Sequence, residues 1–172
     1  MTGQISIKTK FGWVSAFENK GKIIKVKFGK CKDKSISKNL KIFKTNLDKF
    51  LKGRSKSIKS NFLIEGNIIQ KKIWKELKSI KYGKTKSYGE IAKKYKLSPR
   101  YVGKICSQNK IVLAIPCHRV IRSNGSLGGF SGIGGISLKR KLLNFEKSKQ
   151  TNNLKTAKWL WWFIHGNKKI SI

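Results

Sequence analysis

Short runs of β-forming residues alternate with turn residues at the start of the chain. The runs are Ile5–Thr9, Trp13–Phe17 and Ile23–Phe28, and the breaks between them are Lys10-Phe11-Gly12 and Asn19-Lys20-Gly21. Apolar and polar residues alternate within the runs, which is typical of strands with one buried face. The pattern predicts an antiparallel hairpin or meander.

Residues 32–60 are rich in Lys, Ser and Asn, but their apolar residues recur at roughly helical spacing. This spacing predicts one helix with ragged ends. Residues 62–66 are a candidate for one more strand. Because the pattern then becomes helical, we place the main boundary between 64 and 69, with a first domain over 1–66 and a second over 67–150.

Three helices are predicted in the second domain. An apolar stripe runs from Ile69 to Ile80, and Tyr82-Gly83 ends that helix. Ser87 and Glu90 have the spacing of a capping box, and Ser98 followed by Pro99 starts the next helix. Two short helices joined by a tight turn, the second carrying cations, are typical of a helix-turn-helix, but an ordinary helical pair in a basic protein fits this pattern equally well.

The apolar run at residues 111–115 is followed by Pro116, Cys117 and His118. The run predicts a buried strand with a nucleophile at its end. A thiol reacts as thiolate, and the neighbouring His118 can accept its proton while Arg119 and the positive surroundings favour the anion. An isolated Cys-His pair would more often be a structural cysteine beside a chance histidine, so the pair needs its context.

Charge points to nucleic acid as the first partner to consider. The chain has 41 Lys and Arg against 7 Asp and Glu, a net charge of +34, and such a field attracts polyphosphates. Nearly all of these cations are Lys in a chain also rich in Ile and Asn, so compositional bias explains the charge as well. No segment approaches the roughly 20 apolar residues that span a bilayer.

Cysteine usage points to a reducing compartment. Cys31, Cys106 and Cys117 are odd in number and form no CxxC pair, the start of the chain lacks a secretory signal, and the two histidines are far from Cys31. Cys106 is expected to be a packing residue. We therefore expect an intracellular, cytoplasmic protein with no metal site. We also expect a monomer without a cofactor, nucleoid-associated in a prokaryote.

Several motifs in order carry a family resemblance across about residues 67–146. Ile115-Pro-Cys-His-Arg-Val120 resembles the active-site motif of the O6-alkylguanine-DNA alkyltransferases, the methylated-DNA–protein-cysteine methyltransferases. Trp74–Leu77 with Tyr82–Ala92 resembles the family's approach to its helix-turn-helix, and Ser98–Gly103 resembles its recognition helix. The blocks Ser123–Gly125, Gly128–Gly132 and Lys139–Glu146 complete the pattern.

The resemblance implies an α+β fold. A small N-terminal α/β domain, an antiparallel sheet plus a helix of the ribonuclease-H-like kind, would precede a mainly helical domain with the helix-turn-helix. It also implies direct repair: irreversible transfer of the alkyl group from O6-alkylguanine in double-stranded DNA to Cys117, with O4-alkylthymine as a further substrate. Each molecule would act once.

Roles of individual residues follow from the same resemblance. His118 would remove the thiol proton, Glu146 would orient His118, and Asn109 would brace the turn. Arg100 would fill the stack vacated by the flipped base, and Tyr88 would push the phosphate and bond the purine. The other residues expected on the substrate or DNA side are Tyr101, Arg119, Val120, Phe130, Ser131 and Lys139.

Four features depart from the family pattern: Lys81 stands where a Pro is common and Ile69 where a Phe is usual, changes that the core should tolerate, and the other two concern the pocket. Phe130 stands where a Tyr is common, and the loop from Phe130 to Lys139 is two residues longer, which leaves the alkyl preference open. The basic and aromatic tail, 151–172, lies outside the resemblance, and we expect its run at 159–164 to form a helix packed on the body rather than to contact a membrane.

Two other functions are alternatives to direct repair. They are a non-catalytic lesion binder of the same fold and a basic architectural protein, neither of which needs a nucleophile.

Overall fold

Three antiparallel strands form the N-terminal sheet of the computed structural model, which describes residues 2–130 and 132–165, with side chains as far as residue 150. Strands β1 (Thr2–Thr9), β2 (Gly12–Asn19) and β3 (Lys22–Phe28) lie in the order β1-β2-β3, so the predicted meander is confirmed. Lys20 and Gly21 both have positive φ, as in the tight turns whose twist matches that of the flanking strands.

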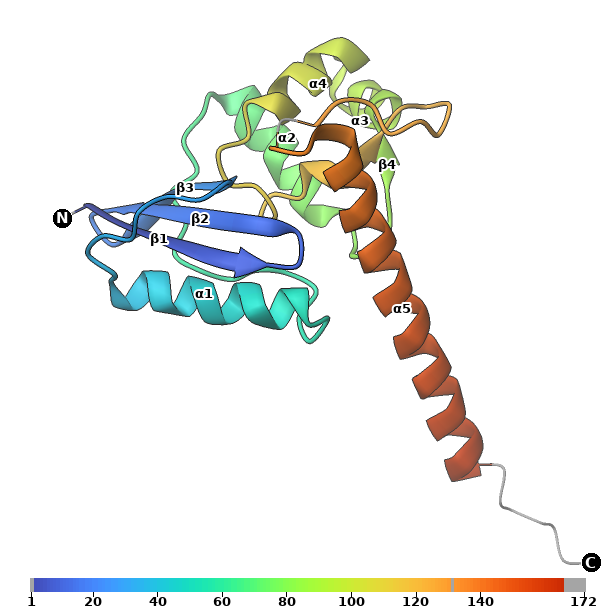
Figure 1. The fold of residues 1–172 in the computed structure, drawn as a ribbon. Helices are drawn as coiled ribbons and strands as arrows, with labels where there is room; N and C mark the ends of the chain where they lie inside the picture. Colours follow the sequence, from blue (N-terminus) through green and yellow to red (C-terminus); the bar gives the residue numbers. More distant parts are fainter. Residues whose placement is uncertain (1, 131, 166–172) are drawn as a thin grey trace, which may run out of the picture.

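Helix α1 (Lys38–Leu51) covers one face of this sheet (Figure 1). Ser37 caps it by accepting from the Leu40 amide, and its inner stripe of Leu40, Phe43, Leu47 and Phe50 is buried. The predicted helix is therefore present. The strand considered for 62–66 is not, because this segment pairs with β3 only through one bridge between Ile23 and Phe62.

The second half of the chain begins with three helices, α2 (Ile68–Ser79), α3 (Tyr88–Tyr95) and α4 (Pro99–Ser107). The capping box of Ser87 and Glu90 and the cap at Ser98 form as predicted. Lys96 adopts positive φ and ends α3 in a left-handed cap. Trp74 of α2 donates to the Ile105 carbonyl at 3.2 Å, so α4 is anchored on α2.

The carboxylate of Glu76 ties α2 to the elements that precede α4. It is almost fully buried and accepts hydrogen bonds from Lys86 at 2.7 Å, Lys94 at 2.6 Å and Tyr95 at 3.1 Å. The bonds from the two lysines lower its pKa to about 2 in spite of burial. The carboxylate thus stays ionised and holds α3 against α2.

The segment that carries Cys117 is not the strand we expected. Ile111 forms a bridge with Val26 of β3, the chain then turns at Leu113 with φ of 69°, and Cys117–Arg119 form a turn of 3-10 helix, η1. The short strands β4 (Lys86–Ser87) and β5 (Val120–Ile121) pair in parallel beyond it. An apolar run indicates burial but does not distinguish a strand from a buried turn.

Helix α5 (Gly135–His165) closes the described part of the chain. It crosses the predicted domain boundary at 150 without a break. The helix expected over 159–164 is present as part of α5, whose C-terminal half extends away from the sheet in Figure 1, and the expected packing of its side chains lies outside the described side chains. No helix in the described part of the chain is long and apolar enough to cross a membrane.

Candidate active site

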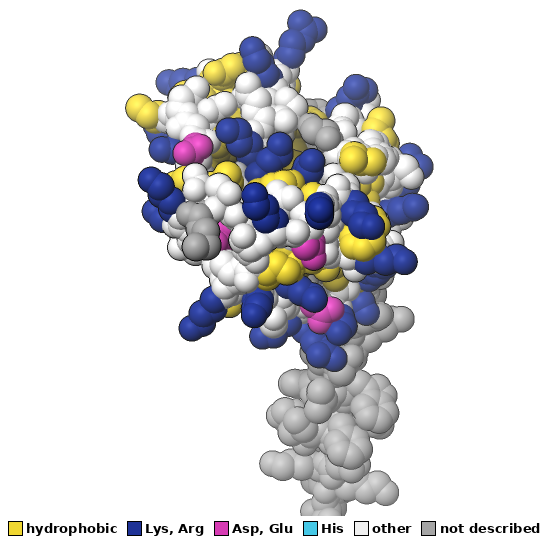
Figure 2. Space-filling view, turned by 60° about the vertical axis from the view of Figure 1, so that its left-hand side comes forward, with side chains coloured by type: hydrophobic (Ala, Val, Ile, Leu, Met, Phe, Trp, Pro, Cys, Tyr) yellow, Lys and Arg dark blue, Asp and Glu magenta, His cyan; other side chains and the backbone are white. Residues whose placement is uncertain are grey.

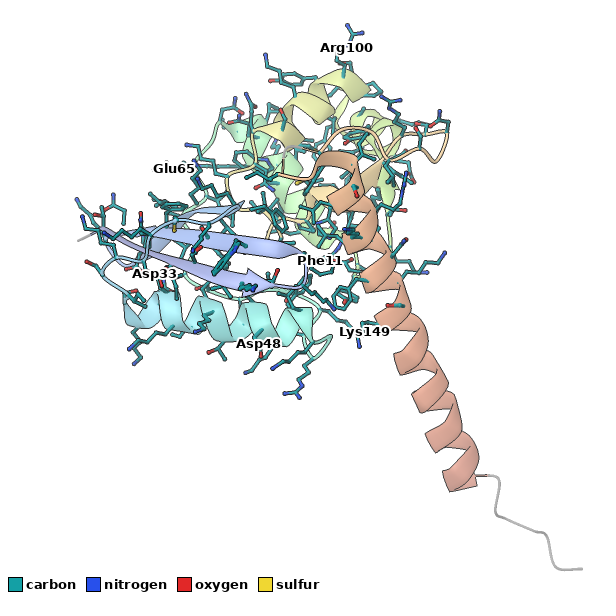
Figure 3. The ribbon with its side chains drawn as sticks, in the orientation of Figure 1. Phe11, Asp33, Asp48, Glu65, Arg100 and Lys149 are labelled. Atoms are coloured by element: carbon teal, nitrogen blue, oxygen red, sulfur yellow. The ribbon has the colours of Figure 1, made fainter. Side chains whose placement is uncertain are left out.

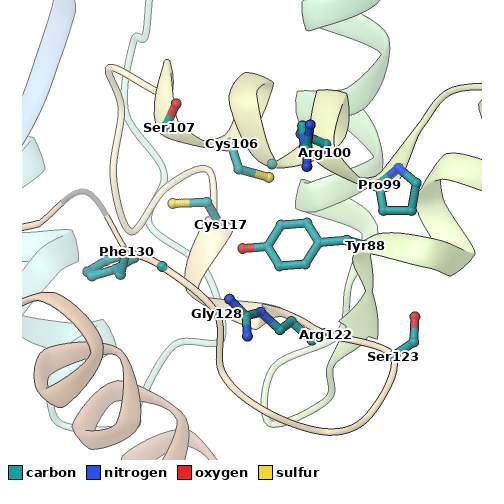
Figure 4. Close-up of a pocket in the computed structure, with 12 residues that line it drawn as sticks. Tyr88, Pro99, Arg100, Cys106, Ser107, Cys117, Arg122, Ser123, Gly128 and Phe130 are labelled. Atoms are coloured by element: carbon teal, nitrogen blue, oxygen red, sulfur yellow. The ribbon is translucent and has the colours of Figure 1, made fainter.

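A pocket of about 680 Å³ opens between α3, α4, η1 and the loop that follows β5 (Figure 4). Four of the predicted site residues line it: Cys117, Tyr88, Arg100 and Phe130. The pocket therefore joins segments that the sequence places up to 42 residues apart, since it includes both Tyr88 and Phe130.

The thiol of Cys117 is held by Asn109. The Asn109 amide nitrogen donates to Sγ of Cys117 at 3.4 Å and to the Ile115 carbonyl at 2.8 Å, while its oxygen accepts from the Ile111 amide at 2.9 Å. One buried side chain thus bonds both ends of the turn that presents the nucleophile. This geometry matches the bracing role expected for Asn109.

Cys117 is a neutral thiol at rest. Burial raises its pKa, and the hydrogen bond from Asn109 and the charge of Lys139 oppose this rise without cancelling it. The expected help from positive charge comes from Lys139 rather than from Arg119, and burial outweighs it in the resting protein. The thiol needs a base to become a nucleophile.

His118 is suited to be that base. Its side chain is fully buried, and its Nε2 lies 2.8 Å from Oε1 of Glu146. Its Nδ1 has no hydrogen-bond partner among the described residues. Burial lowers the pKa of His118 more than the bond to Glu146 raises it, so the imidazole is neutral near pH 7.

The surroundings of Glu146 determine which nitrogen of His118 carries the proton. Its two oxygens also accept from Nε and Nη2 of Arg119, both at 2.9 Å, and from the Gly83 amide at 3.0 Å. Burial alone would raise the pKa of Glu146, but the bonds from His118 and Arg119 lower it to about 2. An ionised carboxylate only accepts, so Nε2 of His118 donates and Nδ1 keeps a free lone pair.

Arg119 does not face the pocket mouth, contrary to our expectation of a role on the DNA side. It is buried, and besides its two bonds to Glu146 its Nη1 donates to the Ile80 carbonyl at 2.7 Å. A guanidinium in this position neutralises and orients the carboxylate. Sequence alone does not distinguish such a buried arginine from an exposed one.

Lys139 fixes the side of the pocket that faces Tyr88. Its ammonium is fully buried and donates to the carbonyls of Val120 at 2.6 Å and of Leu127, with longer contacts of 3.4 Å to the Gly129 carbonyl and 3.5 Å to the Tyr88 hydroxyl. Burial lowers its pKa to about 8. Lys139 is thus a cationic centre around which the loop 127–129 is folded.

Tyr88 projects from the start of α3 into the pocket (Figure 4). Burial is the main reason that its pKa rises to about 12, so its hydroxyl remains a donor at neutral pH. Gly128 packs against the ring: a Cβ there would lie 3.3 Å from Cε2 of Tyr88, and its φ is +67°. A residue with a side chain would be strained at this position.

The start of α4 presents Arg100 and Tyr101 to the outside. Figure 3 shows Arg100 pointing away from the body at the outer end of α4, and Tyr101 is 38% exposed. Figure 2 shows Lys and Arg side chains spread over the face in view, with few acidic ones among them. Ser131 lies outside the described residues.

Eight of the twelve residues that line the pocket were not among the predicted site residues, and Cys106 and Arg122 are the two with reactive or charged side chains. We expected Cys106 to be a packing residue, and it is buried, but Figure 4 shows it among the lining residues near Cys117. Burial raises its pKa to about 12, so it is a poor nucleophile. Cys106 follows Gly103 by three residues, so both line the pocket from one face of α4, but the sequence alone does not show that this face borders a cavity.

Comparison with known proteins gives a consistent result. Residues 68–148 match the family described as 6-O-methylguanine DNA methyltransferase, DNA binding domain. A methylated-DNA–protein-cysteine methyltransferase of Metallosphaera sedula is 37% identical over 142 residues, which cover 80% of this chain and 88% of that protein. The protein of the same name from Sulfolobus acidocaldarius is 36% identical over 78% of this chain and 86% of its own length.

Solved structures agree with these relatives. The crystal structure of Mycobacterium tuberculosis O6-methylguanine methyltransferase has a TM-score of 0.75 and 28% identity, and the match covers 87% of this chain and 94% of that one. A structure of the Mycobacterium tuberculosis protein in complex with DNA has a TM-score of 0.74 and 29% identity, over 85% and 93% of the two chains.

Proposed function

Because this chain belongs to the methylated-DNA–protein-cysteine methyltransferase family, we propose that it repairs DNA by moving the O6-alkyl group of a guanine irreversibly to its own Cys117. The observation that carries the proposal is the buried array of Cys117, His118 and Glu146 at a pocket large enough for a purine. A protein that only binds lesions has no use for such an array.

Cys117, His118 and Glu146 together can carry out the transfer in two steps, deprotonation of the thiol and displacement at the alkyl carbon. Nδ1 of His118 takes the thiol proton through one bridging water, and Glu146 stabilises the imidazolium that forms. Sγ of Cys117 then attacks the alkyl carbon, the bond from that carbon to O6 breaks, and its electron pair leaves with the guanine. The hydroxyl of Tyr88 donates to the departing base.

The product explains why each molecule acts once. Regenerating the thiol would require water to displace a thiolate from the carbon of a thioether, and an unactivated thiolate is a poor leaving group. The base at Nδ1 of His118 can activate the thiol before transfer, but it does not change the leaving group afterwards. Alkylation therefore consumes the nucleophile.

The reaction requires the lesion to leave the duplex. In our proposal α3 and α4 act as a helix-turn-helix that docks in the minor groove, where little sequence is read. Arg100 enters the base stack and Tyr88 rotates the phosphate, while Tyr101 contacts the backbone. The solved complex of a relative with DNA supports this partner.

The organisation of the chain is part of the same proposal. Residues 1–66 form a ribonuclease-H-like domain, and residues 67–150 carry DNA binding and alkyl transfer; the stretch from 151 on, whose first residues continue α5, has no part in the reaction. One chain supplies the pocket and the array, which supports a monomer. Its expected place is the cytoplasm, at the nucleoid in a prokaryote.

Stoichiometry tests the proposal. Increasing amounts of protein are incubated with a duplex that contains one O6-methylguanine, and the remaining lesion is quantified after digestion. We expect one lesion lost per protein molecule, with no turnover. If the protein binds the lesion but removes none, a non-catalytic lesion binder replaces the proposal; if it shows no preference for the lesion, a basic architectural protein does.

A further inference from the structure

Strand β3 of the N-terminal sheet contacts the segment that leads to the nucleophile. The Val26 amide donates to the Lys110 carbonyl at 2.8 Å, and the Val26 carbonyl accepts from the Val112 amide at 3.3 Å. Lys110 directly follows Asn109, which holds Sγ of Cys117. The edge strand of this sheet therefore helps to hold the segment that positions the thiol of Cys117.

Two residues later, the same strand contacts the wall of the pocket. The Phe28 ring is buried and packs edge to face on Phe130, with 6.4 Å between ring centroids and 64° between planes. A Cβ at Gly132 would lie 2.7 Å from Cε1 of Phe130 and 3.1 Å from Cδ2 of Phe28. The backbone of the pocket loop is thus closely packed against both rings.

Phe130 and the reacting thiol of Cys117 line the same pocket. Figure 4 shows the Phe130 ring and the Cys117 thiol at the same end of the pocket. The loop that carries Phe130 is rich in glycine, with positive φ at Gly128 and Gly134, and Lys139 holds its first part through the carbonyls of Leu127 and Gly129. Phe28 packs on the ring of Phe130, which follows that part.

We propose that Phe28 is a positioning residue that sets, through Phe130, the room left for the O6-alkyl group beside Cys117. Val26 and Phe28 are two positions apart on one strand, and their side chains are both buried. A strand is stiff over this distance, so it fixes the separation between thiol and wall. This inference rests on the proposed function and assigns the N-terminal domain a part in alkyl selectivity.

The test compares two alkyl groups in the same duplex context. Single-turnover rates are measured at saturating duplex containing O6-methylguanine or O6-benzylguanine. In Phe28→Ala the wall loses its support, so we expect the benzyl-to-methyl rate ratio to rise by at least about fivefold, with the affinity for undamaged duplex unchanged. Phe28→Leu, which keeps most of the bulk, is expected to shift the ratio in the same direction by less.

A matched control separates positioning from general destabilisation. Phe43 is fully buried under the sheet and contacts Phe62 rather than the pocket loop, so Phe43→Leu should leave the ratio at the wild-type value. Phe130→Ala should raise the ratio, and adding Phe28→Ala to it should cause no further change, because Phe28 acts through Phe130.

Several outcomes would overturn the inference. An unchanged ratio in the folded Phe28 variants, an equal shift in Phe43→Leu, or additive effects in the double variant would each do so. If Phe28→Ala does not fold, the benzyl-to-methyl rate ratio of Phe28→Leu is used instead, and an unchanged ratio in that variant overturns the inference. If the wild-type protein transfers neither group, the proposed function itself fails, which is a different result from transfer with an unchanged ratio.

Discussion

Nε2 of His118 lies 2.8 Å from Oε1 of Glu146, and both side chains are almost fully buried. Glu146 also binds Arg119 and the Gly83 amide, so it is fixed in position and held ionised. This relationship leaves Nδ1 of His118 as a free base one residue from the nucleophile.

Replacing Glu146 should damage both chemistry and stability. Glu146→Gln leaves Arg119 buried without its counter-charge, and we expect a loss of about 3 kcal/mol in the free energy of unfolding. It also removes the charge that stabilises the imidazolium, so the methyl-transfer rate should fall by about 100-fold. Urea unfolding and single-turnover kinetics at saturating DNA measure the two effects. A rate within a factor of two of wild type would exclude the proposed role of Glu146.

The rate of methyl transfer should be nearly independent of pH around neutrality. Burial raises the pKa of Cys117 above 9.0 and lowers that of His118 below 6.5, so thiol and neutral imidazole coexist between these values. The rate should fall only at acid pH, as His118 becomes protonated. A rise of about tenfold per pH unit from 6.5 to 8.5 would instead indicate a free thiolate that forms without the base.

Glu76 should make stability depend on acid pH. Its pKa is lowered to about 2 from 4.5, so its contribution is complete above pH 4.5 and is lost as pH falls toward 2. Glu76→Gln should destabilise the protein by roughly 2 kcal/mol at pH 7. Between pH 4.5 and 2 the variant should lose less of its remaining stability than the wild-type protein does. Asp48→Asn, at an exposed pair with Lys52, is the control and should change little. Equal pH profiles for wild type and Glu76→Gln would refute this assignment.

Arg100 should matter for duplex DNA and much less for unpaired lesions. If its side chain fills the stack, Arg100→Ala should slow repair of a duplex O6-methylguanine by about 10-fold or more, since extrusion of a paired base costs a few kcal/mol. The effect should shrink for a single-stranded oligonucleotide. Arg54→Ala, at an exposed arginine after α1, removes the same charge elsewhere. Equal losses from the two variants would mean that only charge is involved.

Local chemistry explains which parts of the fold could be predicted. The caps at Ser87 and Ser98 depend on side chains that bond amides three residues away, so their motifs determine the helix starts. The strand predicted for 111–115 is a turn instead, because the turn depends on Leu113 at positive φ and on pairing with a distant strand. The burial of Arg119 depends on Glu146, 27 residues later, and no local pattern reports such a contact.

The sequence predicted several residues of the candidate site correctly, but it did not predict the protonation state of the thiol. The resemblance to the alkyltransferases is confirmed by the relatives, and Cys117, Tyr88, Arg100 and Phe130 do meet in one pocket. The direction of the thiol pKa was wrong because burial outweighs a positive surface that water screens. Cys106 was overlooked because a buried cysteine has the same sequence pattern whether it faces a core or a cavity.

The most direct test of the central claim is the intact mass of the protein after incubation with a duplex that contains one O6-methylguanine. The account predicts a single gain of about 14 Da, the mass of one added CH₂ on a thiol, mapped to Cys117. The gain should be absent in Cys117→Ala and retained in Cys106→Ala. No gain in the wild-type protein, or a gain that persists in Cys117→Ala, would contradict the account.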